Sequence, residues 1–190
     1  FSCRKAATDK DDNILRVSLS DEISTLDPAQ SYDTISGTIV YQVYEQLYHY
    51  HYLKRPYLLI PLLADSLPKV DQGGKRYTIK IKQGVRYQDN KVFAGQPRFV
   101  KAQDFVTQIK RLAFKGTNSN GWWLFDGKIK GLNDFREKAG NDIEKFKSLE
   151  VEGLKTPDDQ TLIIELNSPY PQMLYALAMS FTSPLPMDVV

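Results

Sequence analysis

The sequence predicts an α+β fold in which a mixed sheet packs with helices. Two segments, 77–82 and 161–166, are rich in strand-forming residues, and the first alternates apolar with polar side chains. A third segment, Lys101–Leu112, repeats its apolar residues at helical spacing. Helices and antiparallel strands interspersed in this way are typical of an α+β domain.

The first fifty residues predict a strand, a turn and a helix. Leu15, Val17 and Leu19 alternate with polar residues, as in a short strand with one buried face. Asp27–Pro28 then favours a turn or an extended segment. From Ser36, apolar residues recur at helical spacing as far as Leu47.

The middle of the chain predicts a hairpin followed by a long helix and a loop. Gly73–Gly74 is a turn signal directly before the strand at 77–82. In the helix, Phe105, Ile109 and Leu112 share one face, and Lys101, Gln108 and Arg111 point elsewhere. The glycine-punctuated loop Gly116–Gly131 carries both tryptophans, Trp122 and Trp123.

The last forty residues predict two strands and a helix. Leu149 and Val151 suggest a short strand, and Pro157–Asp159 a turn before the strand Thr161–Leu166. Pro169 and Pro171 then introduce a helix that contains Met173, Leu174 and Leu177.

Composition argues against nucleic acid as a partner and against a membrane-spanning segment. The chain has 190 residues, 42% of them hydrophobic, which is enough to bury a core. Lys and Arg number 25 against 23 acidic residues, so the net charge of +2 lacks the dense basic stripe that nucleic acid requires. Since no apolar run approaches about 20 residues, we expect contact with a membrane only through a lipid anchor.

The single cysteine, Cys3, is the candidate for that anchor. Phe1–Cys3 resembles the end of a bacterial lipobox, in which a small residue precedes a cysteine that becomes lipid-modified. The polar run Arg4–Asn13 has the composition of a flexible tether. The alternative is an unmodified cysteine in a tail.

The residues carry no recognisable catalytic or metal-binding motif. There is no G-x-S-x-G elbow, no phosphate-binding G-x-x-x-x-G-K-[ST] loop and no H-E-x-x-H helix. His49 and His51 would need a further ligand to hold zinc, and a polar aromatic patch with Tyr48, Tyr50 and Tyr52 is the better interpretation. We expect no cofactor, no metal and no enzymatic activity.

Several segments, in order along the chain, resemble motifs of the family-5 extracellular solute-binding proteins, the group of oligopeptide, dipeptide and nickel receptors. Each motif alone is short, but together they cover nearly the whole chain. One departure is Asn90, where relatives usually have a glycine, and another is the segment Val92–Phe99, which we expect to form an extra loop. The motifs are Leu15–Val17 with Thr25–Ala29, Tyr44–Leu47, Pro61–Ser66, Tyr77–Asp89, Val100–Val106 with Lys110–Arg111, Asp158–Leu162, Glu165–Pro171 and Ser183–Pro186.

The resemblance implies an N-terminal fragment of a type II periplasmic-binding-protein-like fold, in which two lobes close over a ligand. On this reading residues 1–13 are the lipobox remnant and tether, and 14–44 are the first segment of lobe I. Residues 45–186 form an additional α+β domain, and 187–190 re-enter lobe I.

The resemblance also implies a function: the substrate-binding component of an ABC importer, lipid-anchored in the periplasm or at the cell surface, which works with a membrane permease. Relatives hold extended peptides, or other small solutes, largely through backbone hydrogen bonds. The matching ligand-binding positions are Tyr32, Asp33, Thr34, Asn120, Trp122 and Trp123. Asn120 stands where relatives usually have tyrosine.

Two other functions remain open on the sequence. One is a hydrolase that acts on cell-wall peptides or sugars, which would need an acid pair or a nucleophile in a cleft. The other is a surface lipoprotein that uses the same fold for interaction or as a chaperone.

Overall fold

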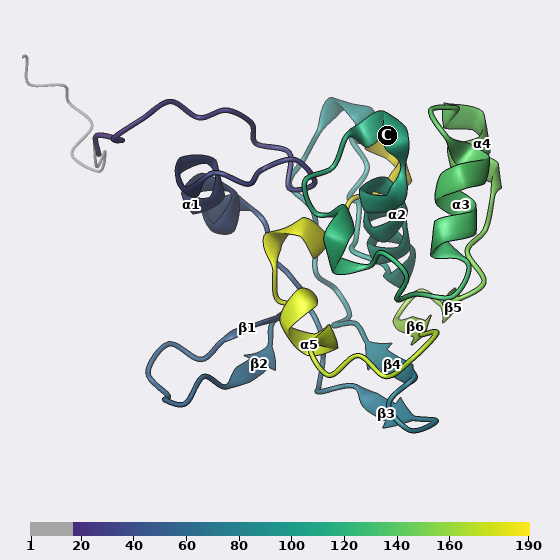
Figure 1. Ribbon diagram of the computed structural model, residues 1–190. Helices are drawn as coiled ribbons and strands as arrows, with labels where there is room; N and C mark the ends of the chain where they lie inside the picture. Colours follow the sequence, from purple (N-terminus) through teal and green to yellow (C-terminus); the bar gives the residue numbers. More distant parts are fainter. Residues whose placement is uncertain (1–16) are drawn as a thin grey trace, which may run out of the picture.

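The computed structural model describes residues 17–190, in which helices lie over one side of an antiparallel sheet (Figure 1). This arrangement confirms the α+β prediction. No helix of the described part is long and apolar enough to span a bilayer. The helices are α1 (Thr34–Val43), α2 (Ala102–Ala113), α3 (Leu132–Ala139), α4 (Ile143–Ser148) and α5 (Met173–Ala176). The strands are β1 (Tyr48–Tyr50), β2 (Leu59–Pro61), β3 (Lys69–Asp71), β4 (Arg76–Lys80), β5 (Leu154–Asp158) and β6 (Thr161–Glu165).

The main sheet has the strand order β3-β4-β6-β5, with every neighbouring pair antiparallel. Its two central strands are those predicted at 77–82 and 161–166, and Tyr77 lies opposite Ile164 in their register. Gly73 and Gly74 form the predicted turn before β4 with φ of 62° and 86°, a region that favours glycine. The edge strand β5 has a register shift between Lys155 and Asp158, where Pro157 can donate no ladder hydrogen bond.

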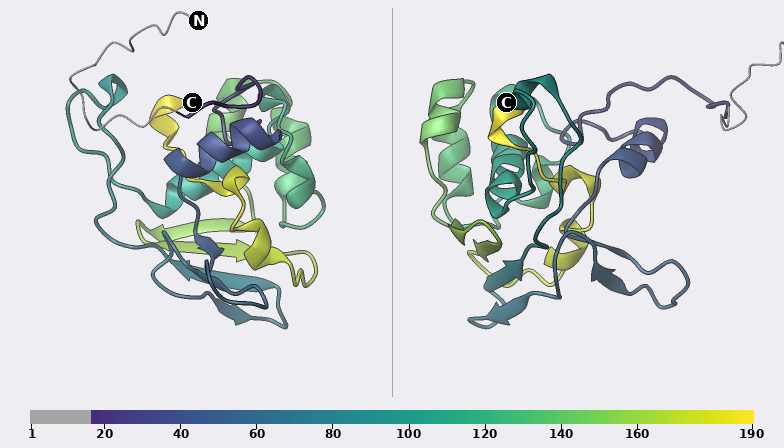
Figure 2. Two further views of the ribbon diagram at one scale, coloured as in Figure 1. Left: turned by 90° about the vertical axis from the view of Figure 1, so that its left-hand side faces the viewer. Right: turned by 180° about the vertical axis from the view of Figure 1, so that it is seen from behind.

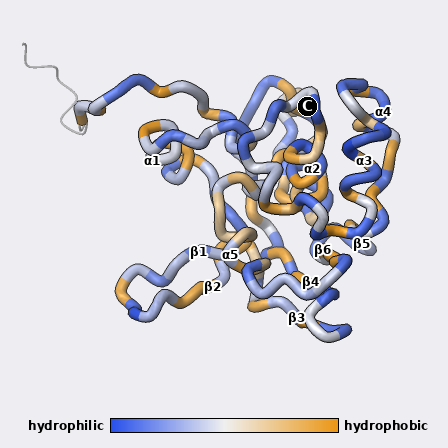
Figure 3. Tube along the Cα trace, in the orientation of Figure 1, coloured by the Kyte–Doolittle hydropathy of each residue, from blue (hydrophilic) through white to orange (hydrophobic). Residues whose placement is uncertain are grey.

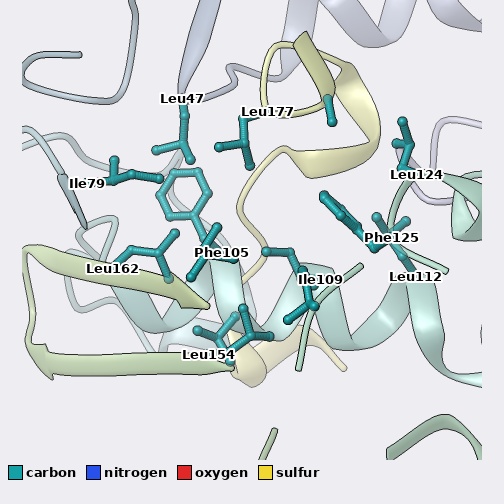
Figure 4. Packing of buried hydrophobic residues seen from close by; sticks show 14 of the residues in the cluster. Leu47, Ile79, Phe105, Ile109, Leu112, Leu124, Phe125, Leu154, Leu162 and Leu177 are labelled. Atoms are coloured by element: carbon teal, nitrogen blue, oxygen red, sulfur yellow. The ribbon is translucent and has the colours of Figure 1, made fainter. Parts of the chain in front are cut away.

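Helix α2 forms the centre of the core (Figure 4). It packs against β5, β6 and α3, and the predicted face of Phe105, Ile109 and Leu112 is fully buried. The opposite side of the helix is covered as well, because the N-terminal segment and residues 180–183 lie over it. Gln108 is therefore only 1% exposed, whereas Lys110 is 4% exposed because it lies against the Phe135 and Phe146 rings of α3 and α4.

The strands β1 and β2 form a separate hairpin that projects from the body of the protein (Figures 1 and 2). In its loop, His51 Nδ1 accepts hydrogen bonds from the backbone N–H groups of Leu53 and Lys54, which gives this histidine a structural role. Figure 3 shows hydrophobic residues in this hairpin as well as in α2, whereas α3 and α4 are largely hydrophilic.

Several predicted elements differ in the structure. Leu15 lies outside the described residues, and Val17–Leu19 form no strand; Val17 is 70% exposed because no neighbouring strand pairs with this segment. Leu149 and Val151 lie in the turn after α4 and are not a strand. The first helix ends at Val43, so Leu47 reaches the core from the following segment.

Residues 132–148 and the segment after Asn90 contain helices that the sequence did not predict. Helices α3 and α4 occupy a region for which the sequence analysis predicted no element, and α4 begins at Asp142, whose carboxylate accepts from two backbone N–H groups. Asn90, where relatives usually have a glycine, is extended, with φ of −140°, and caps a short 3₁₀ helix at Lys91–Phe93. The predicted helix after Pro171 is present as α5.

Candidate ligand-binding surface

The turn at residues 27–31 is held by Asp27. The Asp27 carboxylate accepts a hydrogen bond from the N–H of Ala29 at 2.9 Å, and its carbonyl accepts from the N–H of Ser31 at 2.9 Å. These short-range bonds fold the Asp27–Pro28 segment back on itself, as the sequence predicted. The turn therefore presents the following residues, Tyr32 and Asp33, at the start of α1.

Arg111 of α2 fixes this turn on the body of the protein. Its guanidinium contacts both Asp27 oxygens, with Nη2–Oδ2 and Nη1–Oδ1 distances of 2.6 and 3.1 Å. Burial raises the pKa of the Asp27 carboxyl, but the hydrogen bonds and charge of Arg111 and the N–H of Ala29 outweigh it, so the net pKa is lowered. Asp27 is therefore an ionised anchor.

The loop that carries Asn120 lies against the same turn. The hydroxyl of the neighbouring Ser119 donates a hydrogen bond to the carbonyl of Ala29 at 2.7 Å. The side-chain amide of Asn120 donates to the carbonyl of Gln30 at 2.6 Å. In return, Gln30 Nε2 donates to the carbonyl of Thr117 at 2.8 Å. The structure thus places Asn120 against the turn that directly precedes the predicted ligand-binding segment 32–34.

A third segment, residues 180–183, completes this surface. The ring of Phe181 lies 6.3 Å from that of Tyr32 and packs against Gly121 so closely that a Cβ there would meet it at 2.6 Å. Gln108 Nε2 donates to the carbonyl of Phe181 at 2.7 Å. The Tyr32 side chain remains 69% exposed, so its ring is available to a ligand.

Asp33 and Thr34 use their polar groups in different ways. The Asp33 carboxylate caps α1, accepting from the Ser36 N–H at 2.7 Å and from the Ser24 hydroxyl at 2.5 Å. The Ser24 bond, with those of Ser36, lowers the pKa of Asp33 to about 2. Thr34 is the first residue of α1, where a helix N–H has no partner in the helix itself.

The two tryptophans do not share one environment. Trp122 is half-buried, and the guanidinium of Arg136 from α3 lies 4.8 Å from the centre of its ring. Trp123 is 55% exposed. Both lie on the same loop as Asn120, and within the described residues no ring-to-ring contact joins either of them to Tyr32.

Sequence reasoning missed four residues of this surface: Gln30, Ser31, Ser119 and Phe181. Ser31 is 4% exposed, and its hydroxyl has no hydrogen-bond partner in the part of the chain that the structure describes. The sequence holds no local signal for Gln30 and Ser119, because their hydrogen-bond partners lie about ninety positions away along the chain.

The predicted ligand-binding residues lie on an open surface. Two clefts, of about 550 and 490 Å³, are lined by none of them. Cys3 lies outside the described residues. Within residues 17–190, no three His, Cys, Asp or Glu side chains gather as metal ligands would.

Comparison with known proteins yields one family and several related proteins. The model of the bacterial extracellular solute-binding proteins, family 5 (middle region), matches residues 59–189. The oligopeptide-binding protein AmiA of Streptococcus pneumoniae is 33% identical over 129 residues, which cover 67% of this chain and 18% of AmiA. The dipeptide-binding protein of Escherichia coli is 30% identical over 129 residues, which cover 66% of this chain and 21% of that protein.

A solved structure extends the likeness to the N-terminal segment. The crystal structure of the substrate-binding domain of an oligopeptide ABC transporter from Bacillus anthracis superimposes with a TM-score of 0.68 and 28% identity. The superposition covers 90% of this chain and 29% of that one. The chain thus spans about a fifth of the length of the two curated relatives.

Proposed function

This chain belongs to the bacterial extracellular solute-binding proteins of family 5, and from that membership we propose that it takes part in binding extended oligopeptides for an ABC importer. The proteins of this family are solute-binding proteins and not enzymes. The names of AmiA and of the Bacillus anthracis protein, both of which refer to oligopeptides, support peptide as the solute.

One observation carries the proposal for the site. In the segment 31–34 the Asp33 carboxylate is occupied by Ser24 and Ser36, whereas the Thr34 N–H lies at the free end of α1. The groups left to a ligand are the backbone and the exposed ring of Tyr32. A strand-like peptide that bonds to backbone groups here would be held whatever its side chains are, which suits broad specificity.

The surrounding loop supports the same arrangement. Asn120 is bonded to the Gln30 carbonyl, and we propose that it acts by positioning the turn rather than by contacting the peptide through its side chain. Trp123, which is exposed, is the better candidate of the two tryptophans for a direct contact. The buried hydroxyl of Ser31 is a further group without a partner among the described residues.

In the transport cycle that we propose, peptide bridges two lobes and stabilises their closed form, which the permease then recognises. Residues 14–44 would belong to the first lobe and 45–186 to the additional domain. The hydrogen bonds that join the turn to the Asn120 loop would keep these two parts in register while the lobes close.

We also propose that Cys3 is lipidated and holds the protein in the periplasm or at the cell surface. The extracellular character of the family supports this location. Replacing Cys3 with Ser should release the protein from membranes into the soluble fraction. Unchanged membrane association of the variant in cells fed a labelled fatty acid would contradict the proposal.

Mass spectrometry of co-purifying ligand tests the function. The full gene product, purified from cells grown in peptide-rich medium and then denatured, should release a mixture of short peptides. Release of one sugar or one metal complex would show that peptide is the wrong solute. Hydrolysis of labelled peptides by the purified protein would favour the hydrolase, and a folded protein that releases nothing and binds no added peptide would favour the interaction module.

A further inference from the structure

The cleft of about 490 Å³ lies away from the surface described above, between α2, the end of α4 and strand β5. Half of the residues that line it are apolar and half are polar or charged, and a volume of this size suits a small organic molecule. Among the side chains that line it is one from the inner side of α2, Lys110. The apolar wall consists of Val106, Leu149, Val151, Leu154, Ile163 and Met187.

Lys110 is an uncommon residue to find there, because it is 4% exposed and carries a charge. Its Nζ lies 5.1 Å from the ring centre of Phe135 and 4.9 Å from that of Phe146. Within residues 17–190 no carboxylate lies within ion-pair distance of it, and no acceptor is hydrogen-bonded to it. Burial lowers the pKa of this ammonium, and the charge of Glu150 on the cleft rim opposes that effect.

The charges around the cleft favour an anion. Lys147 and Lys155 also line it, and Glu150 is the one carboxylate among its lining residues. Lys155 forms an ion pair with Glu165 at 3.3 Å. Because Glu165 also pairs with Arg76 and Lys130, three positive charges surround this one carboxylate. The positive potential on this side of the cleft is therefore not cancelled locally.

A buried ammonium costs stability unless an opposite charge or hydrogen-bond acceptors compensate it, and two ring faces compensate it only in part. We propose that the cleft binds a small monocarboxylate with an apolar body, whose carboxylate pairs with Lys110 and whose body lies on the apolar wall. One cation at the base matches one negative charge, and Glu150 at the rim disfavours a dianion such as phosphate. This site is independent of the proposed peptide site.

Hexanoate is a suitable probe, with hexanol as its uncharged counterpart and inorganic phosphate as the small polar anion. In the 190-residue chain with ¹³C-labelled lysine side chains, hexanoate should shift the Lys110 ε-carbon resonance saturably. Hexanol and phosphate should leave that resonance largely unchanged. A linear, unsaturating response to hexanoate, or an equal response to phosphate, would overturn the proposal.

Variants separate binding from a purely structural role. Lys110→Met keeps the length and apolar contacts of the side chain, and it should weaken hexanoate binding by about tenfold to a hundredfold, as expected for loss of a charge-assisted hydrogen bond. Its midpoint of thermal unfolding without ligand should be unchanged or higher. The matched control is Lys145→Met, whose lysine is exposed, is paired with Asp142 at 3.9 Å and does not line the cleft, and which should bind hexanoate nearly as well as the wild type.

The opposite pattern would show that Lys110 serves only the core. In that case Lys110→Met would lower the unfolding midpoint, and it would leave any hexanoate response as it is in the wild type. If Lys110→Met fails to fold, Lys110→Gln and the wild-type lysine titration answer the same question.

Discussion

The guanidinium of Arg111 donates hydrogen bonds to both carboxylate oxygens of Asp27, although the two residues are 84 positions apart in the chain. The pair fastens the turn before α1 onto the central helix α2. It also explains why the face of α2 opposite Phe105 carries charged and amide side chains, because Arg111 and Gln108 form hydrogen bonds with the segments that cover this face. In addition, Arg111 Nη1 donates to Gln108 Oε1 at 3.1 Å. The peptide-binding surface that we propose rests on this junction.

Removing the arginine should destabilise the protein. Arg111→Met leaves Asp27 partly buried without its cation, and we expect a loss of about 2 kcal/mol in the free energy of unfolding, between the values for exposed and for fully buried pairs. The control is Lys115→Met, since the Lys115–Glu137 pair is exposed and should contribute less than about 1 kcal/mol. Urea unfolding followed by circular dichroism measures both, and equal losses would contradict the assignment.

The Arg111→Met effect should also depend on pH. The folded-state pKa of Asp27 is lowered, so its contribution is fully present above the unfolded value of about 3.9 and is lost as the pH falls through the folded value. The difference in unfolding free energy between wild type and Arg111→Met should therefore shrink below about pH 4. A difference that stays constant from pH 7 to pH 3 would show that Arg111 acts through packing alone.

Asp33 should titrate far below an ordinary aspartate. The Ser24 hydroxyl and the N–H and hydroxyl of Ser36 stabilise its ionised form, which lowers the pKa to about 2. Carbon-detected NMR of the Asp33 carboxyl should show this value, and Ser24→Ala should raise it. A wild-type titration near the ordinary value would mean that the cap of α1 does not form in solution.

Thr34 offers a test of backbone recognition that spares the helix. Proline is tolerated at the first position of a helix, and the extended backbone of Asp33 (φ −77°, ψ 156°) is compatible with a following proline. In the full gene product, Thr34→Ala should cost less than about 1 kcal/mol of peptide binding, and Thr34→Pro more, because it removes an N–H donor. Isothermal calorimetry with one hexapeptide measures both, and equal losses would count against backbone recognition.

Gly153 should not accept a side chain. A Cβ there would lie 2.6 Å from the carbonyl oxygen of Glu165 and 2.8 Å from that of Lys130, both backbone atoms that cannot rotate away. We expect Gly153→Ala to cost about 1–3 kcal/mol of stability. Gly37→Ala is the matched control, since a Cβ meets nothing within 4 Å and alanine in α1 should gain about 0.5–1 kcal/mol. Thermal unfolding of the two variants should move in opposite directions.

The sequence predicts the parts of this fold that carry strong periodic signals. The face of Phe105, Ile109 and Leu112 on α2 and the central strands β4 and β6 follow from spacing alone, because burial on one side leaves a regular pattern. The segment Val17–Leu19 shows the limit of that reasoning. Its apolar and polar residues alternate, but a segment forms a strand only where a neighbouring strand pairs with it. Helices α3 and α4 are short and polar, and their start signals, such as Asp142 before α4, are weak beside the glycines of that region.

The candidate site is less predictable, because side chains distant in sequence build it. Asp27 and Arg111 both belong to recognisable motifs, but no local pattern says that they pair. The bond from Asn120 to the Gln30 carbonyl likewise depends on how the loop packs beside the turn. Resemblance to the family identifies candidate segments, whereas only the structure shows which side chains hold the turn in place and which are left exposed.

Because β6 lies between β4 and β5, the sheet cannot be completed until the last of its strands has been made. As the chain emerges from its N-terminus, β4 can pair with β3 at once, but its other edge has no partner until Thr161–Glu165 follow. At roughly 5–20 residues per second, translation takes several seconds to deliver them. During that interval the open edge of β4 is a template for any other strand, including one from a neighbouring nascent chain. The length of chain between β4 and β6 therefore sets how long the unfinished sheet is exposed to mispairing.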